Sequence, residues 1–176
     1  MSFNELYILK FLYAFKDFED FRSSSEEQSK IIMFILLFSF ALSRLHIIPI
    51  PAQVSENPGV VWELFEAMQI GYSSSIKDYG KELAQFISDS IYTPTNIRLQ
   101  IIESSVKLGI QLGLCDEDEY QLTIDENLVV INAKNRDLLF NGFQTLLQLL
   151  PPQIYCNTTV TQSVKWTAPS VTIRDK

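Results

Sequence analysis

Histidine, cysteine and glycine are scarce in this sequence, which has one histidine, two cysteines and six glycines among 176 residues. Zinc sites and Ser–His–Asp or Cys–His catalytic sites are built largely from histidine and cysteine. His46 has no acidic residue near it in the sequence, and Cys115 and Cys156 lie far apart. The sequence therefore predicts no metal site and no catalytic nucleophile, and both cysteines are expected to be reduced thiols.

The glycines are scattered along the chain, and they form neither a Walker motif nor a G-x-G-x-x-G pattern. Loops of this kind hold the phosphates of nucleotides and dinucleotides. No cofactor is therefore expected. A pair of catalytic carboxylates can come from any two parts of a chain, so a hydrolase stays open as an alternative.

Positive charge is in deficit, because 14 Lys and Arg residues face 21 Asp and Glu residues, giving a net charge of -7. Such a chain repels the phosphate backbone of nucleic acids, so a nucleic-acid partner is not expected. Hydrophobic residues make up 47% of the sequence and aromatic residues 12%. This composition excludes a disordered protein and predicts a globular domain with a real core.

Long hydrophobic runs are also missing. The most apolar run, Ile31–Leu42, spans only about 18 Å as a helix and falls short of the bilayer core of roughly 30 Å. The start, MSFNELYILK, lacks the positive region and the cleavage site of a signal peptide. We therefore expect a cytoplasmic protein without a membrane partner, and the glycosylation pattern at Asn157-Thr158-Thr159 is then a coincidence.

Hydrophobic periodicity predicts a mainly α fold of the α+β class. A β-hairpin is expected at about 120–132, where Tyr120, Leu122 and Ile124 alternate with polar residues. Residues 1–150 would form one mostly helical globular domain, followed by an extended or strand-forming arm over 151–176. About six helices are predicted to pack around a central apolar helix at 24–45, and they cover residues 3–18, 24–45, 58–71, 76–91, 95–114 and 136–150.

The order of elements in 58–131 is that of a winged helix-turn-helix, with the hairpin as the wing. A DNA-reading helix presents basic and amide side chains, whereas the predicted helix over 95–114 offers only Arg98 and Lys107 as bases. The wing tip is Asp125-Glu126, which repels phosphate. A winged-helix arrangement here is expected to bind protein instead of DNA.

Acidic residues gather in CDEDEYQLTIDEN, Cys115 to Asn127. A calcium loop is not expected, because Tyr120 and Gln121 stand where a third ligand and a glycine are needed. The acidic run is either a solvated surface or a patch that steers a basic partner. Two tryptophans, taken as exposed, complete the set of predicted protein-binding residues. That set is Asp116, Glu117, Asp118, Glu119, Asp125, Glu126, Trp62 and Trp166.

The leading hypothesis for function is a non-enzymatic interaction subunit or adaptor of a larger intracellular assembly, docking through its acidic and aromatic surface. It expects a protein partner, basic in charge, in a homo- or hetero-oligomer. The alternatives are a winged-helix transcriptional regulator and an inhibitor or immunity-type protein against a basic enzyme. A hydrolase with carboxylates that the sequence does not locate is the remaining candidate.

Overall fold

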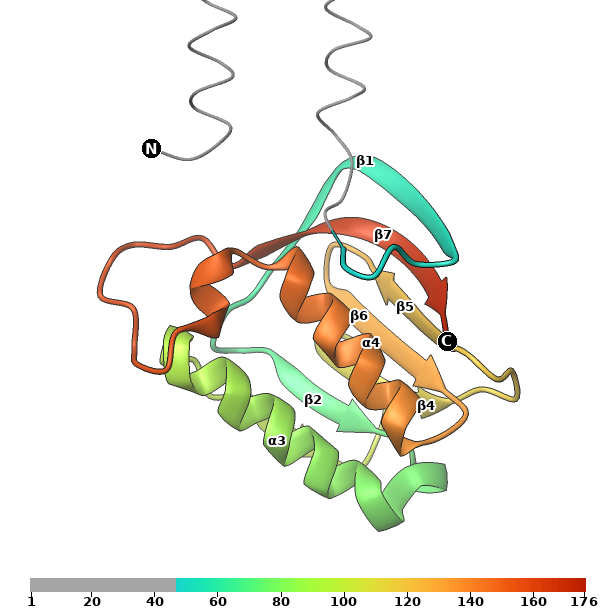
Figure 1. The fold of residues 1–176 in the computed structure, drawn as a ribbon. Helices are drawn as coiled ribbons and strands as arrows, with labels where there is room; N and C mark the ends of the chain where they lie inside the picture. The colour runs from blue at the N-terminus through green and yellow to red at the C-terminus, as the bar shows by residue number, and fades with distance from the viewer. Residues whose placement is uncertain (1–46) are drawn as a thin grey trace, which may run out of the picture. The chain divides into compact units, whose positions relative to one another are not determined.

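The computed structural model describes residues 47–176, which carry seven strands and two α-helices (Figure 1). Contacts divide the chain into two units, 1–44 and 45–176, and the described residues belong to the second. In chain order the elements are β1 (Gln53–Glu63), β2 (Gln69–Tyr72), η1 (Ser74–Ile76), α3 (Lys77–Thr95), β3 (Gln100–Ile102), β4 (Gly109–Leu114), β5 (Tyr120–Ile124), β6 (Leu128–Ala133), α4 (Arg136–Leu149), η2 (Pro152–Tyr155) and β7 (Thr167–Asp175).

The seven strands form one mixed sheet in the order β1-β7-β5-β6-β4-β2-β3. Strand β2 runs parallel to β3 and β4, and β4 runs parallel to β6. The other pairs, β5 with β6, β5 with β7 and β1 with β7, are antiparallel. Helix α3 is the crossover that parallel β2 and β3 require. Both helices lie on the same face of the sheet (Figure 1).

Helix α3 forms because its apolar residues recur at helical spacing and point to the sheet. Leu83, Ile87 and Ile91 are four residues apart and are almost completely buried. The helix ends at Asn96, which has a left-handed φ of 58° and serves as the C-cap. This helix confirms the prediction for 76–91.

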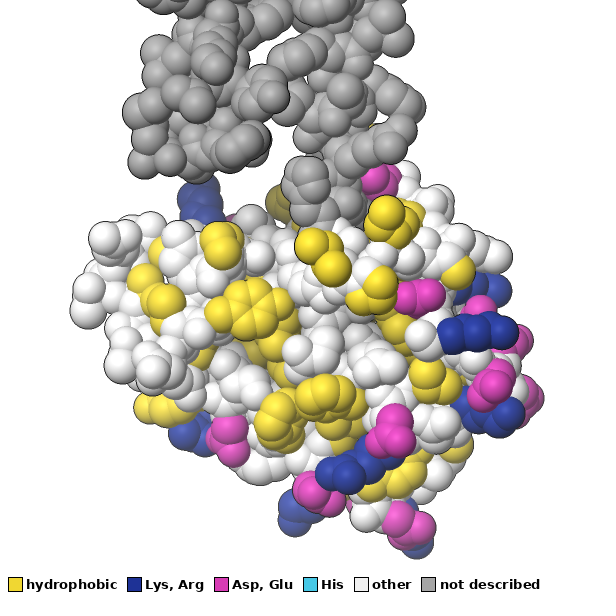
Figure 2. Space-filling model, in the orientation of Figure 1, with side chains coloured by type: hydrophobic (Ala, Val, Ile, Leu, Met, Phe, Trp, Pro, Cys, Tyr) yellow, Lys and Arg dark blue, Asp and Glu magenta, His cyan; other side chains and the backbone are white. Residues whose placement is uncertain are grey.

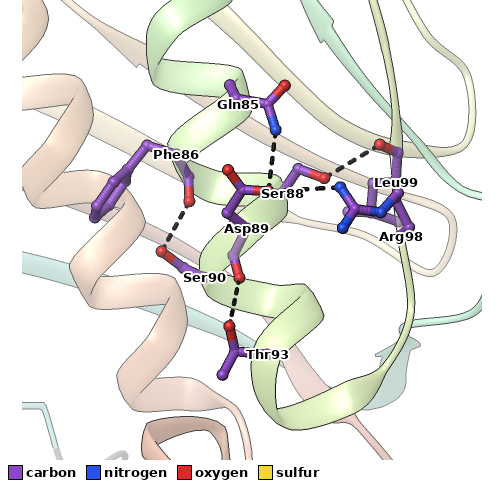
Figure 3. Close-up of polar contacts among 8 residues, drawn as sticks. All are labelled: Gln85, Phe86, Ser88, Asp89, Ser90, Thr93, Arg98 and Leu99. Carbon is purple, nitrogen blue, oxygen red and sulfur yellow. Dashed lines mark hydrogen bonds and ion pairs between the residues drawn. The ribbon is translucent and has the colours of Figure 1, made fainter. Parts of the chain in front are cut away.

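Polar contacts hold the loop that leaves α3 against the helix (Figure 3). The buried Ser88 hydroxyl donates a hydrogen bond to the carbonyl of Leu99 over 3.2 Å. The Arg98 guanidinium lies 3.6 Å from the Asp89 carboxylate and 4.1 Å from the centre of the Tyr92 ring. These contacts fix the direction in which the chain turns from α3 into β3.

Helix α4 confirms the predicted helix at 136–150. The Asn135 side chain caps it by accepting a hydrogen bond from the Leu138 amide over 2.9 Å. Gly142 faces the sheet so closely that a Cβ there would lie 2.6 Å from the Ile131 methyl group. The helix therefore packs directly on β6.

The predicted helix over 58–71 is wrong, because these residues belong to β1, the following turn and β2. The pattern at Val61, Leu64 and Met68 that indicated a helix is not one buried face. Val61 is 54% exposed, whereas the neighbouring Trp62 is completely buried. Alternation across a strand, and not a helical stripe, decides which side chains enter the core.

The predicted helix over 95–114 is also wrong, since it contains β3, a loop and β4. Short segments such as Gly109–Leu114, in which Gln111 is the only polar side chain, fit a buried parallel strand as well as a helix. The winged-helix order in 58–131 and the mainly α class with six helices are therefore wrong. The hairpin at 120–132 is confirmed as β5 and β6. The predicted helices at 3–18 and 24–45 lie outside the described residues.

Residues 151–176 contain η2, a loop and β7. Strand β7 lies between β1 and β5, and its Ala168, Val171 and Ile173 are buried. It thus supplies an internal strand of the sheet and part of the core. Within residues 47–176, neither helix combines the length and the apolar content that crossing a bilayer requires.

Candidate functional site

A groove of about 290 Å³ runs between α3 and α4 on the side that faces away from the sheet's strands. Positions four apart on a helix share a face, so Glu82 and Phe86 reach the groove from α3 as Arg136 and Phe140 do from α4. Figure 2 shows hydrophobic side chains gathered on this helical side of the molecule. The lining residues are Glu82, Leu83, Phe86, Arg136, Asp137 and Phe140.

Two phenylalanines form the apolar part of the groove. The rings of Phe86 and Phe140 are tilted by 47° with centroids 5.6 Å apart. Phe86 also meets the completely buried Phe143 edge to face at 6.2 Å. Phe86 is 47% exposed and Phe140 is 37% exposed. The pair is fixed by the core beneath it yet presents aromatic surface outward, as interface residues do.

An ion pair crosses the groove next to the two rings. The Arg136 guanidinium donates a hydrogen bond to the Glu82 carboxylate over 2.8 Å. The side chains are 53% and 72% exposed, so water screens the pair and its contribution to stability is at most about 1 kcal/mol. The groove therefore presents two aromatic rings beside two charged groups that water reaches, a combination that suits contact with another polypeptide surface.

A second hollow of about 250 Å³ lies between α4, the segment at Ile48 and the end of β7. The Gln148 amide accepts from the Ile48 amide over 2.8 Å and donates to the Ile48 carbonyl over 3.1 Å. Below them the Tyr120 and Thr145 hydroxyls share a buried hydrogen bond of 2.7 Å. Burial raises the pKa of Tyr120 above its usual 10.0, and the bond to Thr145 partly offsets this. The first pair of hydrogen bonds attaches the segment at Ile48 to α4, and the bond between Tyr120 and Thr145 attaches β5 to α4.

The predicted acidic residues do not form one patch. Asp116–Glu119 precede β5 and Asp125-Glu126 follow it, so the length of a five-residue strand, about 16 Å, separates them. Asp118 lies 3.6 Å from Lys134, and Glu119 lies 3.7 Å from Arg174. No observation tests whether these residues bind a protein, and that role stays a prediction.

The two tryptophans are core residues. Trp62 is completely buried in β1, and Trp166 is only 8% exposed. The carbonyl of Trp166 accepts a hydrogen bond from the Leu64 amide over 2.9 Å. The expectation that Trp62 and Trp166 are exposed is therefore wrong, because the alternation of β1 turns Trp62 inward.

The exposed aromatic surface is instead that of Phe86 and Phe140, which lie in the helices predicted at 76–91 and 136–150. Each lies beside the buried stripe of its helix, next to Ile87 and Leu139, and this offset was the available signal. Among residues 47–176, no cluster of three or more His, Cys, Asp and Glu side chains could hold a metal ion.

Comparisons with known proteins find relatives that are enzymes. Residues 44–176 match the model of the family described as glycosyl hydrolase family 20, domain 2. A β-hexosaminidase of Porphyromonas gingivalis is 29% identical over 139 residues, which are 75% of this chain and 17% of the relative. The family 20 β-N-acetylhexosaminidase of Streptomyces coelicolor is 28% identical, with a TM-score of 0.65 over 73% of this chain and 26% of its own.

A β-N-acetylhexosaminidase of Bacteroides fragilis, 14% identical with a TM-score of 0.54 over 73% of this chain and 24% of its own, shares the fold. The chain thus spans about a quarter or less of the length of these relatives.

These matches overturn the predicted functions. The relatives are glycoside hydrolases, so a non-enzymatic adaptor, a winged-helix regulator and an inhibitor of a basic enzyme are all wrong. The expectation of a protein that is not an enzyme is contradicted by the same matches, since the relatives are enzymes. The match covers the whole described sheet and both of its helices. This chain belongs to the family of glycosyl hydrolase family 20, domain 2.

Proposed function

We propose that the protein containing this chain is a β-N-acetylhexosaminidase, and that residues 44–176 form a domain of it that carries no catalytic group. The family match over residues 44–176 is the observation that carries this proposal. The names of the relatives from P. gingivalis and S. coelicolor support the choice of reaction.

The side chains of the groove support the proposal that this domain carries no catalytic group. Glycosidases place carboxyl groups beside the scissile bond, in surroundings that keep one of them protonated. Glu82 is instead 72% exposed and bound to Arg136. Asp137 lies exposed in the first turn of α4. Neither carboxylate is enclosed by surrounding residues.

The helical face, which is the surface of α3 and α4 around Phe86 and Phe140, is the part of this domain that best fits contact with the remainder of the enzyme. Full burial of a phenylalanine stabilises by about 1.5–3 kcal/mol. Covering what is still exposed of Phe86 and Phe140 would therefore add about 1–3 kcal/mol in total. Arg136 and Glu82 beside the rings offer hydrogen bonds to a polar rim. The domain would then stabilise the catalytic part without touching substrate.

The proposal that residues 44–176 carry no catalytic group is tested by comparing the isolated chain with the native species that contains it. An antibody against residues 47–176 captures the native species, and both preparations are given a chromogenic N-acetyl-β-glucosaminide. The captured species is expected to hydrolyse it, and the isolated chain of 176 residues is not. Hydrolysis by the isolated chain would contradict a domain without catalytic groups.

The docking role is tested by the double substitution Phe86→Ser with Phe140→Ser in the gene of the active species. Faster thermal inactivation is expected, with kcat/KM at low temperature unchanged, because the rings are far from any reacting atom in this account. Val61→Ser on β1 is the matched control, since Val61 is more exposed than either ring but lies on an edge strand. Equal inactivation rates in the double variant and the control would show that the helical face is not the interface.

A further inference from the structure

The only N-x-Ser/Thr pattern in the 176 residues, Asn157-Thr158-Thr159, lies on an exposed loop. The loop connects η2 to β7, and all three residues of the pattern are exposed. Asparagine in this pattern, with a middle residue other than proline, accepts N-linked oligosaccharide. Exposure of the whole pattern is the first condition for a carbohydrate chain to fit without disturbing the fold.

The loop is anchored just after the asparagine. The Thr159 hydroxyl donates to the Thr93 carbonyl over 3.1 Å, and the Val160 amide donates to the Pro94 carbonyl over 2.9 Å. These bonds tie the loop to the end of α3, and Figure 1 shows it projecting there beyond the helices. Asn157 thus lies on the outer part of a loop whose base is fixed.

Tyr155 lies two residues before the asparagine and is 58% exposed. Cys156 between them has an extended backbone, with φ of -67° and ψ of 136°, and two residues of such a chain span about 6 Å, within reach of a tyrosine side chain. An exposed tyrosine ring presents an apolar face at low entropic cost. It can therefore lie against the apolar face of the first sugar on Asn157.

A second part of the sequence supplies a route to a glycosylating compartment. Lys30 precedes the twelve residues Ile31–Leu42, and the small residues Ser39 and Ala41 stand two apart at the end of this run. These are the positive residue, the 7–15 apolar residues and the small-x-small cleavage site that a secretory signal combines, and here they follow 29 residues. The family match begins at residue 44, directly after this segment. The expectation of a cytoplasmic protein rested on the first ten residues and on the shortness of Ile31–Leu42 as a membrane span, and neither observation excludes a cleaved segment at residues 30–42.

We propose that the chain is translocated through this segment and that Asn157 receives an N-linked oligosaccharide. The donor is an oligosaccharide carried on a polyprenyl diphosphate. The Asn157 Nδ2 forms a bond to the anomeric carbon, and the bond from that carbon to the diphosphate oxygen breaks. The amide loses one proton to a base, and the polyprenyl diphosphate leaves. This modification is independent of the enzyme activity proposed above.

The test expresses the full chain, without an added leader, in eukaryotic cells that perform N-glycosylation. The intact mass of the product is measured before and after treatment with peptide N-glycosidase, which leaves aspartate at an occupied position. One glycan is expected on the chain, absent in Asn157→Gln and in Thr159→Ala and present in Thr159→Ser, which keeps the hydroxyl. Tyr155→Ala is expected to lower the occupied fraction severalfold, whereas Tyr155→Phe keeps it.

A product with unmodified Asn157 would overturn the proposal. A second version, with residues 42–176 behind a cleavable leader, separates the two reasons for such a result. If this version is glycosylated and the natural chain is not, the translocation step is refuted. If neither is glycosylated although both are translocated, Asn157 is refuted as the acceptor. If Tyr155→Ala and the natural chain carry a glycan on the same fraction of molecules, the contact between the Tyr155 ring and the sugar is refuted.

Discussion

Replacing Gly142 by alanine tests how α4 is seated on the sheet. Alanine in the middle of a helix is normally preferred over glycine by about 1 kcal/mol. Here the new Cβ would lie 2.6 Å from the Ile131 methyl group and 3.2 Å from the Tyr120 ring. Both neighbours are buried and cannot move into solvent. Overpacking of this kind costs about 1–3 kcal/mol, so Gly142→Ala is expected to destabilise the domain by about 0–2 kcal/mol.

Urea unfolding followed by tryptophan fluorescence measures this change. Both tryptophans of the chain, Trp62 and Trp166, are buried in the described domain and report on its unfolding. Asn141→Ala is the matched control, because it gains helix propensity at the neighbouring exposed position without meeting the sheet. It should stabilise by about 0.5 kcal/mol. A Gly142→Ala variant stabilised as much as the control would refute the close packing of α4 on β6.

Two further predictions concern single polar contacts. Tyr120→Phe removes the buried hydrogen bond to Thr145 and should cost about 1 kcal/mol at neutral pH. Burial raises the pKa of Tyr120 in the folded state above 10.0. The contribution of Tyr120 to the free energy of unfolding is therefore complete below pH 10, and it is lost as the pH rises through the pKa of the folded state. The variant should therefore lose less stability than the natural chain above pH 10, and an identical alkaline decline in urea titrations would contradict this assignment. Glu82→Gln, Arg136→Gln and the double variant should give a coupling energy below about 1 kcal/mol that falls with added salt; a larger, salt-independent coupling would show that the pair is buried.

The parts of the fold that follow from the sequence are those with long or regular patterns. Apolar residues at steps of four and three, as at Tyr79, Leu83 and Phe86, fit one face of a helix and not of a strand, and α3 follows this spacing. The alternation of Tyr120, Leu122 and Ile124 gives β5 and its hairpin partner. In these segments the local pattern and the tertiary burial agree.

The parallel strands could not be derived in the same way. Strand β4 pairs with β2 and β6, which are distant in sequence, so its pairing leaves no local signal. Gln111 is the only polar side chain among its six residues, and a strand covered on both faces shows little alternation to mark its period. A single sequence therefore reads β4 as the continuation of a helix.

The candidate site was missed for a related reason. Phe86 and Phe140 lie one position from the buried stripes of their helices, and only the packing of α3 beside α4 shows that their rings meet. The acidic residues drew attention because they are adjacent in sequence, whereas β5 separates Asp118 from Asp125 in space. Residues that are adjacent in the sequence need not lie together in the fold, and residues that form a site need not be adjacent in the sequence.

The most direct test of the proposed activity is the substrate preference of the species captured through residues 47–176. Rates are compared on an N-acetyl-β-glucosaminide and on the matched β-glucoside, which lacks the acetamido group. The account predicts release of N-acetylglucosamine from the first substrate at a rate at least about tenfold higher, equivalent to about 1.4 kcal/mol in the barrier. Equal rates, or no hydrolysis of either substrate, would contradict it.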